Sequence, residues 1–104
     1  MSAVPEEKIL IAVNVPPVLE DRVIDWLLER QSPGFTSYNV HGHSSRHDHL
    51  SVSEQVSGRQ RRLQFEVLLE RESLESFIGD LSAAFAGTDS YYWAMPIVAT
   101  GHLG

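Results

Sequence analysis

The chain contains no cysteine among its 104 residues, which excludes disulfide bonds, thiolate metal ligands and thiol nucleophiles. It has no apolar run near the roughly 20 residues that a transmembrane helix requires, so we expect no membrane insertion. Basic side chains are also few, since 8 Lys and Arg stand against 14 Asp and Glu, giving a formal net charge of -6. This acidic balance argues against a nucleic-acid partner, whose phosphate backbone needs cations.

The length fits one domain spanning residues 1–104, and hydrophobic residues make up a normal globular share of 42%. The N-terminal segment lacks the basic and apolar regions of a secretory signal, so we expect a cytoplasmic protein. One feature departs from this ordinary profile. Of the five histidines, four lie between His41 and His49.

Hydrophobic periodicity predicts four strands and two helices. The expected strands cover residues 8–15, 35–41, 62–69 and 91–98, and the expected helices cover 18–31 and 73–85. Ser73 is expected to cap the second helix and Gly87 to stop it. Pro96 indicates an edge position or a bulge for the last strand.

The order β-α-β, β-α-β predicts an α+β, ferredoxin-like βαββαβ fold, an antiparallel sheet with both helices on one face. The other face is expected to carry Leu10, Ala12 and Leu68 among polar residues. Because these are too apolar to face water, they indicate a homo-oligomer interface. Residues 42–58, rich in Ser and His, are expected to form a long flexible loop.

Several motifs resemble a small family of PII-like proteins, related to the nitrogen-regulatory PII and CutA-type proteins. The resemblance rests on the motifs Pro-Pro-x-Leu-Glu (16–20), Gly-Phe-Thr-Ser-Tyr (34–38), His-Gly-His (41–43), Ser-Glu-Gln-Val-Ser-Gly-Arg (53–59), Tyr-Trp (92–93) and Gly-His-Leu (101–103). The resemblance implies a PII-like homotrimer with its sheets packed together inside. Because such proteins are often encoded beside heavy-metal efflux pumps, it also implies a role linked to metal homeostasis and heavy-metal resistance. The 42–58 loop would then contact a protein partner such as a membrane transporter or efflux system.

The chain departs from the nucleotide-binding PII pattern in one respect. PII proteins hold ATP phosphates with a Gly- and Lys-rich loop after the second helix, but residues 86–90 (Ala-Gly-Thr-Asp-Ser) contain one Gly, no Lys and an acid. Gly-Arg-Gln at 58–60 looks like a PII loop motif, yet it precedes the third strand and is read as a chance match. ATP or ADP binding is therefore not the leading hypothesis.

The histidine cluster predicts a divalent transition-metal site for Zn, Cu, Ni or Co. Histidines two residues apart share a face in an extended chain, and neutral imidazole with a carboxylate suits these ions. The predicted ligands are His41, His43, His47, His49, Asp48 and, from a neighbouring subunit, His102. Two other interpretations remain open, namely a solvated polar loop and a pH sensor that charges on mild acidification.

A second candidate site binds an anion or a nucleotide in clefts between subunits. Its predicted contacts are Arg46, Arg59, Arg61 and Gly87. The alternative for Arg59, Arg61 and Arg62 is a strand end whose arginines are solvated or ion-paired. Enzyme activity is the third hypothesis, and we expect this protein to have no catalytic activity. The loop after the first strand is Val-Pro-Pro instead of an anion cradle with Arg, and spacing suggests no catalytic set.

Overall fold

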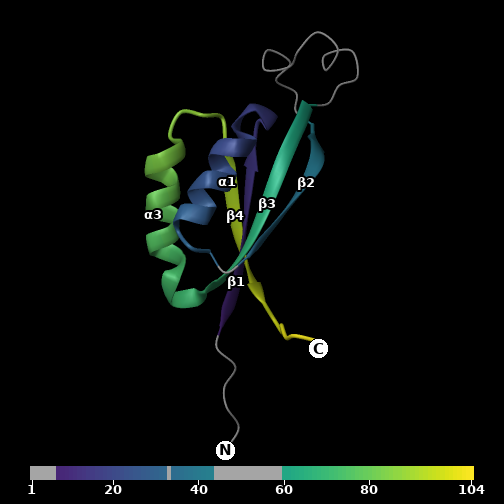
Figure 1. Cartoon of the computed structure of the whole chain (residues 1–104), viewed down its shortest axis with the longest axis vertical. Coiled ribbons are helices and arrows are strands. Elements are labelled where there is room, and N and C mark those ends of the chain that lie inside the picture. Colours follow the sequence, from purple (N-terminus) through teal and green to yellow (C-terminus); the bar gives the residue numbers. More distant parts are fainter. Residues whose placement is uncertain (1–6, 33, 44–59) are drawn as a thin grey trace, which may run out of the picture.

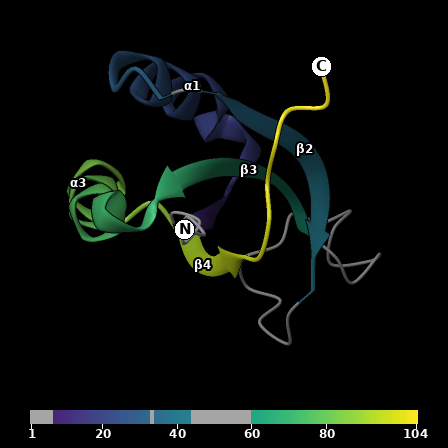
Figure 2. The same ribbon diagram turned by 90° about the horizontal axis from the view of Figure 1, so that it is seen from below.

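The computed structural model describes residues 7–32, 34–43 and 60–104. Strands β1 (Lys8–Val15), β2 (Phe35–Gly42), β3 (Gln60–Glu70) and β4 (Tyr91–Ile97) form one antiparallel sheet in the order β2-β3-β1-β4. Helices α1 (Glu20–Glu29) and α3 (Leu74–Phe85) cover the same face of this sheet (Figures 1 and 2). The predicted ferredoxin-like α+β fold is confirmed. None of the helices in the described ranges is long and apolar enough to cross a membrane.

The core lies between the two helices and the sheet face that they cover. Alternate residues of β1 and β3 point into it because side chains of a strand alternate between its faces. Its buried members are Ile11, Val13, Val15, Val23, Leu27, Leu63, Phe65, Val67, Phe77, Leu81 and Phe85. Trp26 packs against this cluster with its ring edge-on to Phe77 and Phe85 at centroid distances of 5.3 and 5.7 Å.

The helix starts differ from the sequence prediction. A 3-10 turn at Pro17–Leu19 precedes α1, so the α-helix is shorter than the expected 18–31. Ser73 occupies the N-cap position of α3, but its side chain makes no capping hydrogen bond, and this prediction is wrong. A capping side chain needs an extended backbone, whereas Ser73 has φ -88° and ψ -7° because it ends the 3-10 turn Arg71–Ser73.

The sheet face turned away from the helices carries apolar residues from three strands, and we call it the open face. Leu10 pairs with Leu68 on one side and with Met95 on the other, and Ala12 pairs with Trp93. Ala12 is buried, whereas Trp93 and Met95 are 43% and 39% exposed. The described chain therefore leaves an apolar patch at the middle of the open face, as the strand pattern predicts.

The two edges of the sheet are β2 and β4. Pro96 lies in the edge strand β4, where a missing backbone N–H is tolerated, in agreement with the sequence. Strand β2 extends to Gly42, one residue beyond the expected end. The predicted loop 42–58 lies outside the described residues from residue 44 onward.

Candidate functional site

Two of the three described histidines of the predicted metal site, His41 and His43, lie where β2 ends. His41 is in the strand, His43 follows it directly, and both side chains are exposed. On the inner side of β2, His41 pairs with Arg61 of β3. Because this neighbour is a cation, further ligands for a metal ion at His41 have to come from the outer side of β2 or from beyond His43.

His102 lies far from these two histidines in the same chain. It follows β4, which ends where Ile97 pairs with Lys8, whereas His41 lies at the other end of the sheet (Figure 1). Its Nδ1 accepts a hydrogen bond from the Gly104 amide at 3.1 Å. The other predicted ligands, His47, Asp48 and His49, lie outside the described residues. Within the described part of the chain, no three His, Asp or Glu side chains are grouped as a metal site.

The predicted anion site also includes both described residues and residues outside the described ranges. Arg61 is exposed and pairs with His41 near the end of β2, and Gly87 is exposed in the turn before β4, while Arg46 and Arg59 lie outside the described residues. The arginine that contacts the turn at 86–90 is Arg62 instead. Its side chain points to the open face and is only 3% exposed.

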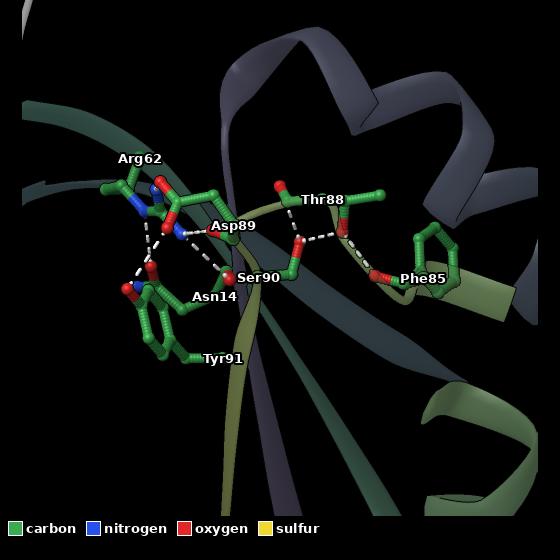
Figure 3. Close-up of polar contacts among 7 residues, drawn as sticks. All are labelled: Asn14, Arg62, Phe85, Thr88, Asp89, Ser90 and Tyr91. Atoms are coloured by element: carbon green, nitrogen blue, oxygen red, sulfur yellow. Dashed lines mark hydrogen bonds and ion pairs between the residues drawn. The ribbon is translucent and has the colours of Figure 1, made fainter. Parts of the chain in front are cut away.

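Arg62 joins β3, β1 and the turn before β4 through several contacts (Figure 3). Its Nε donates to Asn14 Oδ1 at 2.6 Å, and one terminal nitrogen donates to the carbonyls of Asn14 (3.1 Å) and Asp89 (2.7 Å). The other terminal nitrogen lies 3.4 Å from the Asp89 carboxylate. The guanidinium also lies 5.5 Å from the centre of the Tyr91 ring. We call Asn14, Arg62, Asp89 and Tyr91 the Arg62 clamp.

The turn that the clamp holds has an unusual backbone. Gly87 and Asp89 have φ of +76° and +56°, and for Asp89 this left-handed conformation carries strain that glycine avoids. Hydrogen bonds of the turn's own side chains support it. Thr88 Oγ1 donates to the Phe85 carbonyl at 2.6 Å, and the Thr88 and Ser90 hydroxyls lie 2.8 Å apart.

The clamp changes what this turn offers a ligand. The guanidinium is paired with acceptors of the protein itself, and Asp89 adds a negative charge that repels an anion. Beside the turn lies a cleft of about 330 Å³ between the end of α3 and β4. Leu81, Phe85 and Tyr92 contribute to its mainly apolar walls, with Thr88 and Ser90 among its polar members. This cleft suits a small, largely uncharged group better than a phosphate.

A row of polar side chains continues from the clamp across the open face. Asn14 Nδ2 donates to Gln64 Oε1 at 3.3 Å, and Gln64 Nε2 donates to the Tyr38 oxygen at 2.9 Å. Tyr38 in turn donates its hydroxyl to Glu66 at 2.7 Å. This hydrogen bond to Glu66 is the main reason that the pKa of Tyr38 is raised above its usual 10.0, and the negative charge of Glu66 adds to the effect.

Sequence reasoning allowed for an ion-paired Arg62, as the contact with Asp89 bears out, but it did not identify the partners in the clamp or the polar row. The alternation of β3 places Arg62, Gln64 and Glu66 on one face, and that of β1 places Asn14 on the same face. The available signal was thus a set of polar residues on a face expected to be partly apolar. Their partners are set by strand register, which the sequence pattern does not specify.

Two solved structures are similar to this chain in fold. A crystal structure of a DUF3240 family protein from Shewanella baltica OS155 has a TM-score of 0.73 and 23% identity, with 100% of both chains covered. CPII, a nitrogen regulatory PII-like protein from Thiomonas intermedia K12 bound to ADP, AMP and bicarbonate, has a TM-score of 0.68 and 11% identity. That likeness covers 92% of this chain and 97% of CPII. At these identities, the likeness shows the fold.

No curated protein matches the sequence significantly. The family model described as "Protein of unknown function (DUF3240)" matches residues 6–104, nearly the whole chain. Together with the PII-like fold, this match confirms the predicted resemblance to a small PII-like family. The chain belongs to the DUF3240 family.

Proposed function

We propose that this protein is a trimeric, non-catalytic PII-like regulatory module that binds a divalent transition-metal ion, Zn, Cu, Ni or Co. The observation that carries the proposal is the pair of exposed imidazoles, His41 and His43, at the end of edge strand β2. Neutral imidazole is a common ligand for these ions, and histidines two residues apart in extended chain can point to one ion. His47, Asp48 and His49, beyond the described residues, are the proposed additional ligands.

The regulatory part of the proposal rests on the PII-like fold and on where the histidines lie. Metal binding at the end of β2 would act directly on the predicted 42–58 loop, which begins where β2 ends. This loop is the proposed contact with a protein partner, such as a membrane transporter or metal-efflux system. Metal binding and partner binding would thus be coupled through this loop, which would link the protein to metal homeostasis.

The trimer is supported by the open face. Trp93 and Met95 are exposed there beside Leu10 and Leu68, and burying such residues against other subunits releases water from apolar surface. Packing the open faces of three chains together would leave both helices and the end of β2 on the outside.

Isothermal titration with zinc, copper, nickel and cobalt tests the metal site. We expect the double variant His41→Ala/His43→Ala to bind metal at least about tenfold more weakly. Mutation of residues that only hydrogen-bond to a metal ligand already lowers metal affinity by about tenfold or more. Asn39→Ala is the matched control, since Asn39 is an exposed residue of the same strand that leaves both imidazoles in place. Unchanged affinity in the double variant would refute the role of this pair.

Nucleotide or anion binding between subunits is the second candidate function. CPII, which shares the fold, was solved with ADP, AMP and bicarbonate, and the cleft beside Gly87 suits an uncharged ring. The pairing of Arg62 with Asp89 weighs against phosphate binding there. A thermal-shift screen with ATP, ADP, AMP and cyclic nucleotides tests it, and no shift at millimolar ligand would count against this function.

A further inference from the structure

The outer edge of β2 is an unusual sheet edge. Within the described residues, β2 has a strand beside it on one side only. It is eight residues long and contains neither proline nor Lys, Arg, Asp or Glu. Natural sheet edges of this length are normally protected by charged residues, proline or bulges, because exposed backbone groups pair readily with another strand. The other edge, β4, carries Pro96. The edge of β2 is therefore suited to pair with an added strand.

The C-terminal tail, residues 98–104, has the properties that such a strand needs. Every one of its residues is exposed, and Val98 and Leu103 are 98% and 104% exposed. The tail continues from β4 beyond the body of the sheet (Figures 1 and 2). An extended segment of this length spans about 23 Å, close to the length of β2.

The tail cannot bring His102 to His41 of its own chain. From the end of β4 it must first pass β1 and β3 to reach β2, which is three strand spacings or about 14 Å. Ile97 and His102 are five residues apart, about 17 Å of extended chain, so His102 would stop near Phe35. His41 lies a further six residues, about 20 Å, along β2. Only the tail of a second copy can supply His102 to this position.

We propose that the tail of one copy adds as a parallel strand to the β2 edge of the next copy, with residues 98–104 beside residues 37–43. In this register His102 lies beside His41 on the same face, at the spacing of neighbouring strands. Three imidazoles, His41 and His43 from one copy and His102 from the next, then surround one position on the side of β2 away from Arg61. Three imidazoles supply three of the four ligands that a tetrahedral zinc ion takes. This part of the inference rests on the proposed metal function.

The register also gives the exposed Leu103 a contact and is consistent with an assembly of several copies. Leu103 would lie on the open face beside Gly42 and near Val40, which reduces its exposure. A head-to-tail contact of this kind uses two different surfaces, β2 and the tail, and it closes into a ring when the rotation between copies allows. It is thus compatible with a trimer in which each metal site is completed by a neighbour.

Disulfide cross-linking tests the docking, because the chain has no native cysteine. We expect the double variant Asn39→Cys/Thr100→Cys to give covalent species larger than a dimer on oxidation, since each chain links to two neighbours. Ser76→Cys/Thr100→Cys is the control, because Ser76 is an exposed residue of α3 outside the proposed contact. Equal cross-linking in the control would overturn the docking. So would efficient dimers of Asn39→Cys alone, which would indicate that β2 pairs with β2 of another copy.

Metal titration of His102→Ala tests the shared site separately. We expect its affinity to fall at least about tenfold, as in the His41→Ala/His43→Ala variant, while Thr100→Ala retains the wild-type value. Specific cross-linking together with unchanged affinity in His102→Ala would refute the shared site and leave the docked tail. If the wild-type protein binds none of the four metals, the proposed function and the shared site both fail, and the cross-linking result decides the docking alone.

Discussion

Replacing Arg62 by leucine removes the guanidinium that joins β1, β3 and the turn before β4. The wild-type side chain is 3% exposed and donates three hydrogen bonds of 2.6 to 3.1 Å. One goes to the side-chain oxygen of Asn14, and the other two go to the backbone carbonyls of Asn14 and Asp89. Leucine fills part of the space but leaves these three oxygens without their donor. The variant therefore tests whether the clamp stabilises this end of the sheet.

The size of the effect follows from these contacts. A hydrogen bond to a charged group contributes about 1.5–3 kcal/mol, but such contributions are not additive when one side chain makes all of them. The Asp89 carboxylate is 40% exposed and lies 3.4 Å away, so its ion pair adds little in water. We expect Arg62→Leu to lower the free energy of unfolding by about 2–4 kcal/mol, which moves the urea midpoint by about 1–2 M.

Urea unfolding followed by circular dichroism measures this change, at one fixed protein concentration because assembly also stabilises the fold. Arg61→Leu is the matched control, since Arg61 is the adjacent arginine of β3 but is exposed. We expect it to cost less than about 1 kcal/mol. If Arg62→Leu is as stable as wild type to within about 0.5 kcal/mol, or if both variants lose the same amount, the clamp is not the stabilising contact described above.

Two further predictions concern the open face. The raised pKa of Tyr38 means that its hydrogen bond to Glu66 stabilises the fold fully below pH 10 and is lost as the pH rises through the raised pKa. An absorbance titration at 295 nm of the wild type and of Tyr38→Phe identifies the ionisation of Tyr38 as the step that the variant lacks. We expect this step above pH 10, and a step below pH 10 would contradict the raised pKa. Trp93→Glu should reduce the mass of the assembly in light scattering, because it places a charge in the proposed interface. Leu28→Glu, on the exposed side of α1, should leave that mass unchanged, and equal effects of the two would argue against the open face.

The main secondary elements could be predicted because they depend on local pattern. The alternation of Leu63, Phe65 and Val67 fixes which face of β3 is buried, and all three residues are in the core. The start of α3 could not be predicted in the same way. Ser73 is a good capping residue by type, but the preceding 3-10 turn gives it a helical backbone in which its oxygen cannot act as a cap.

In the candidate site, too, some features could be predicted from local sequence and others depend on the tertiary structure. The spacing of His41 and His43 in the sequence is enough to predict a pair of imidazoles in extended chain, because strand geometry depends on neighbouring residues only. That Arg62, and not Arg61, contacts the turn at 86–90 depends on which face of β3 each occupies and on how closely the turn approaches Asn14.

The sequence by itself determined the fold class, the buried faces and the family resemblance of this acidic, cysteine-free chain, since each depends on residue types at short spacing. The tertiary structure alone decided that His102 lies at the opposite end of the sheet from His41, that Arg62 is paired with Asp89, and that β2 is an edge strand with no second neighbour among the described residues. These are relations between residues distant in sequence, and strand order and register set them.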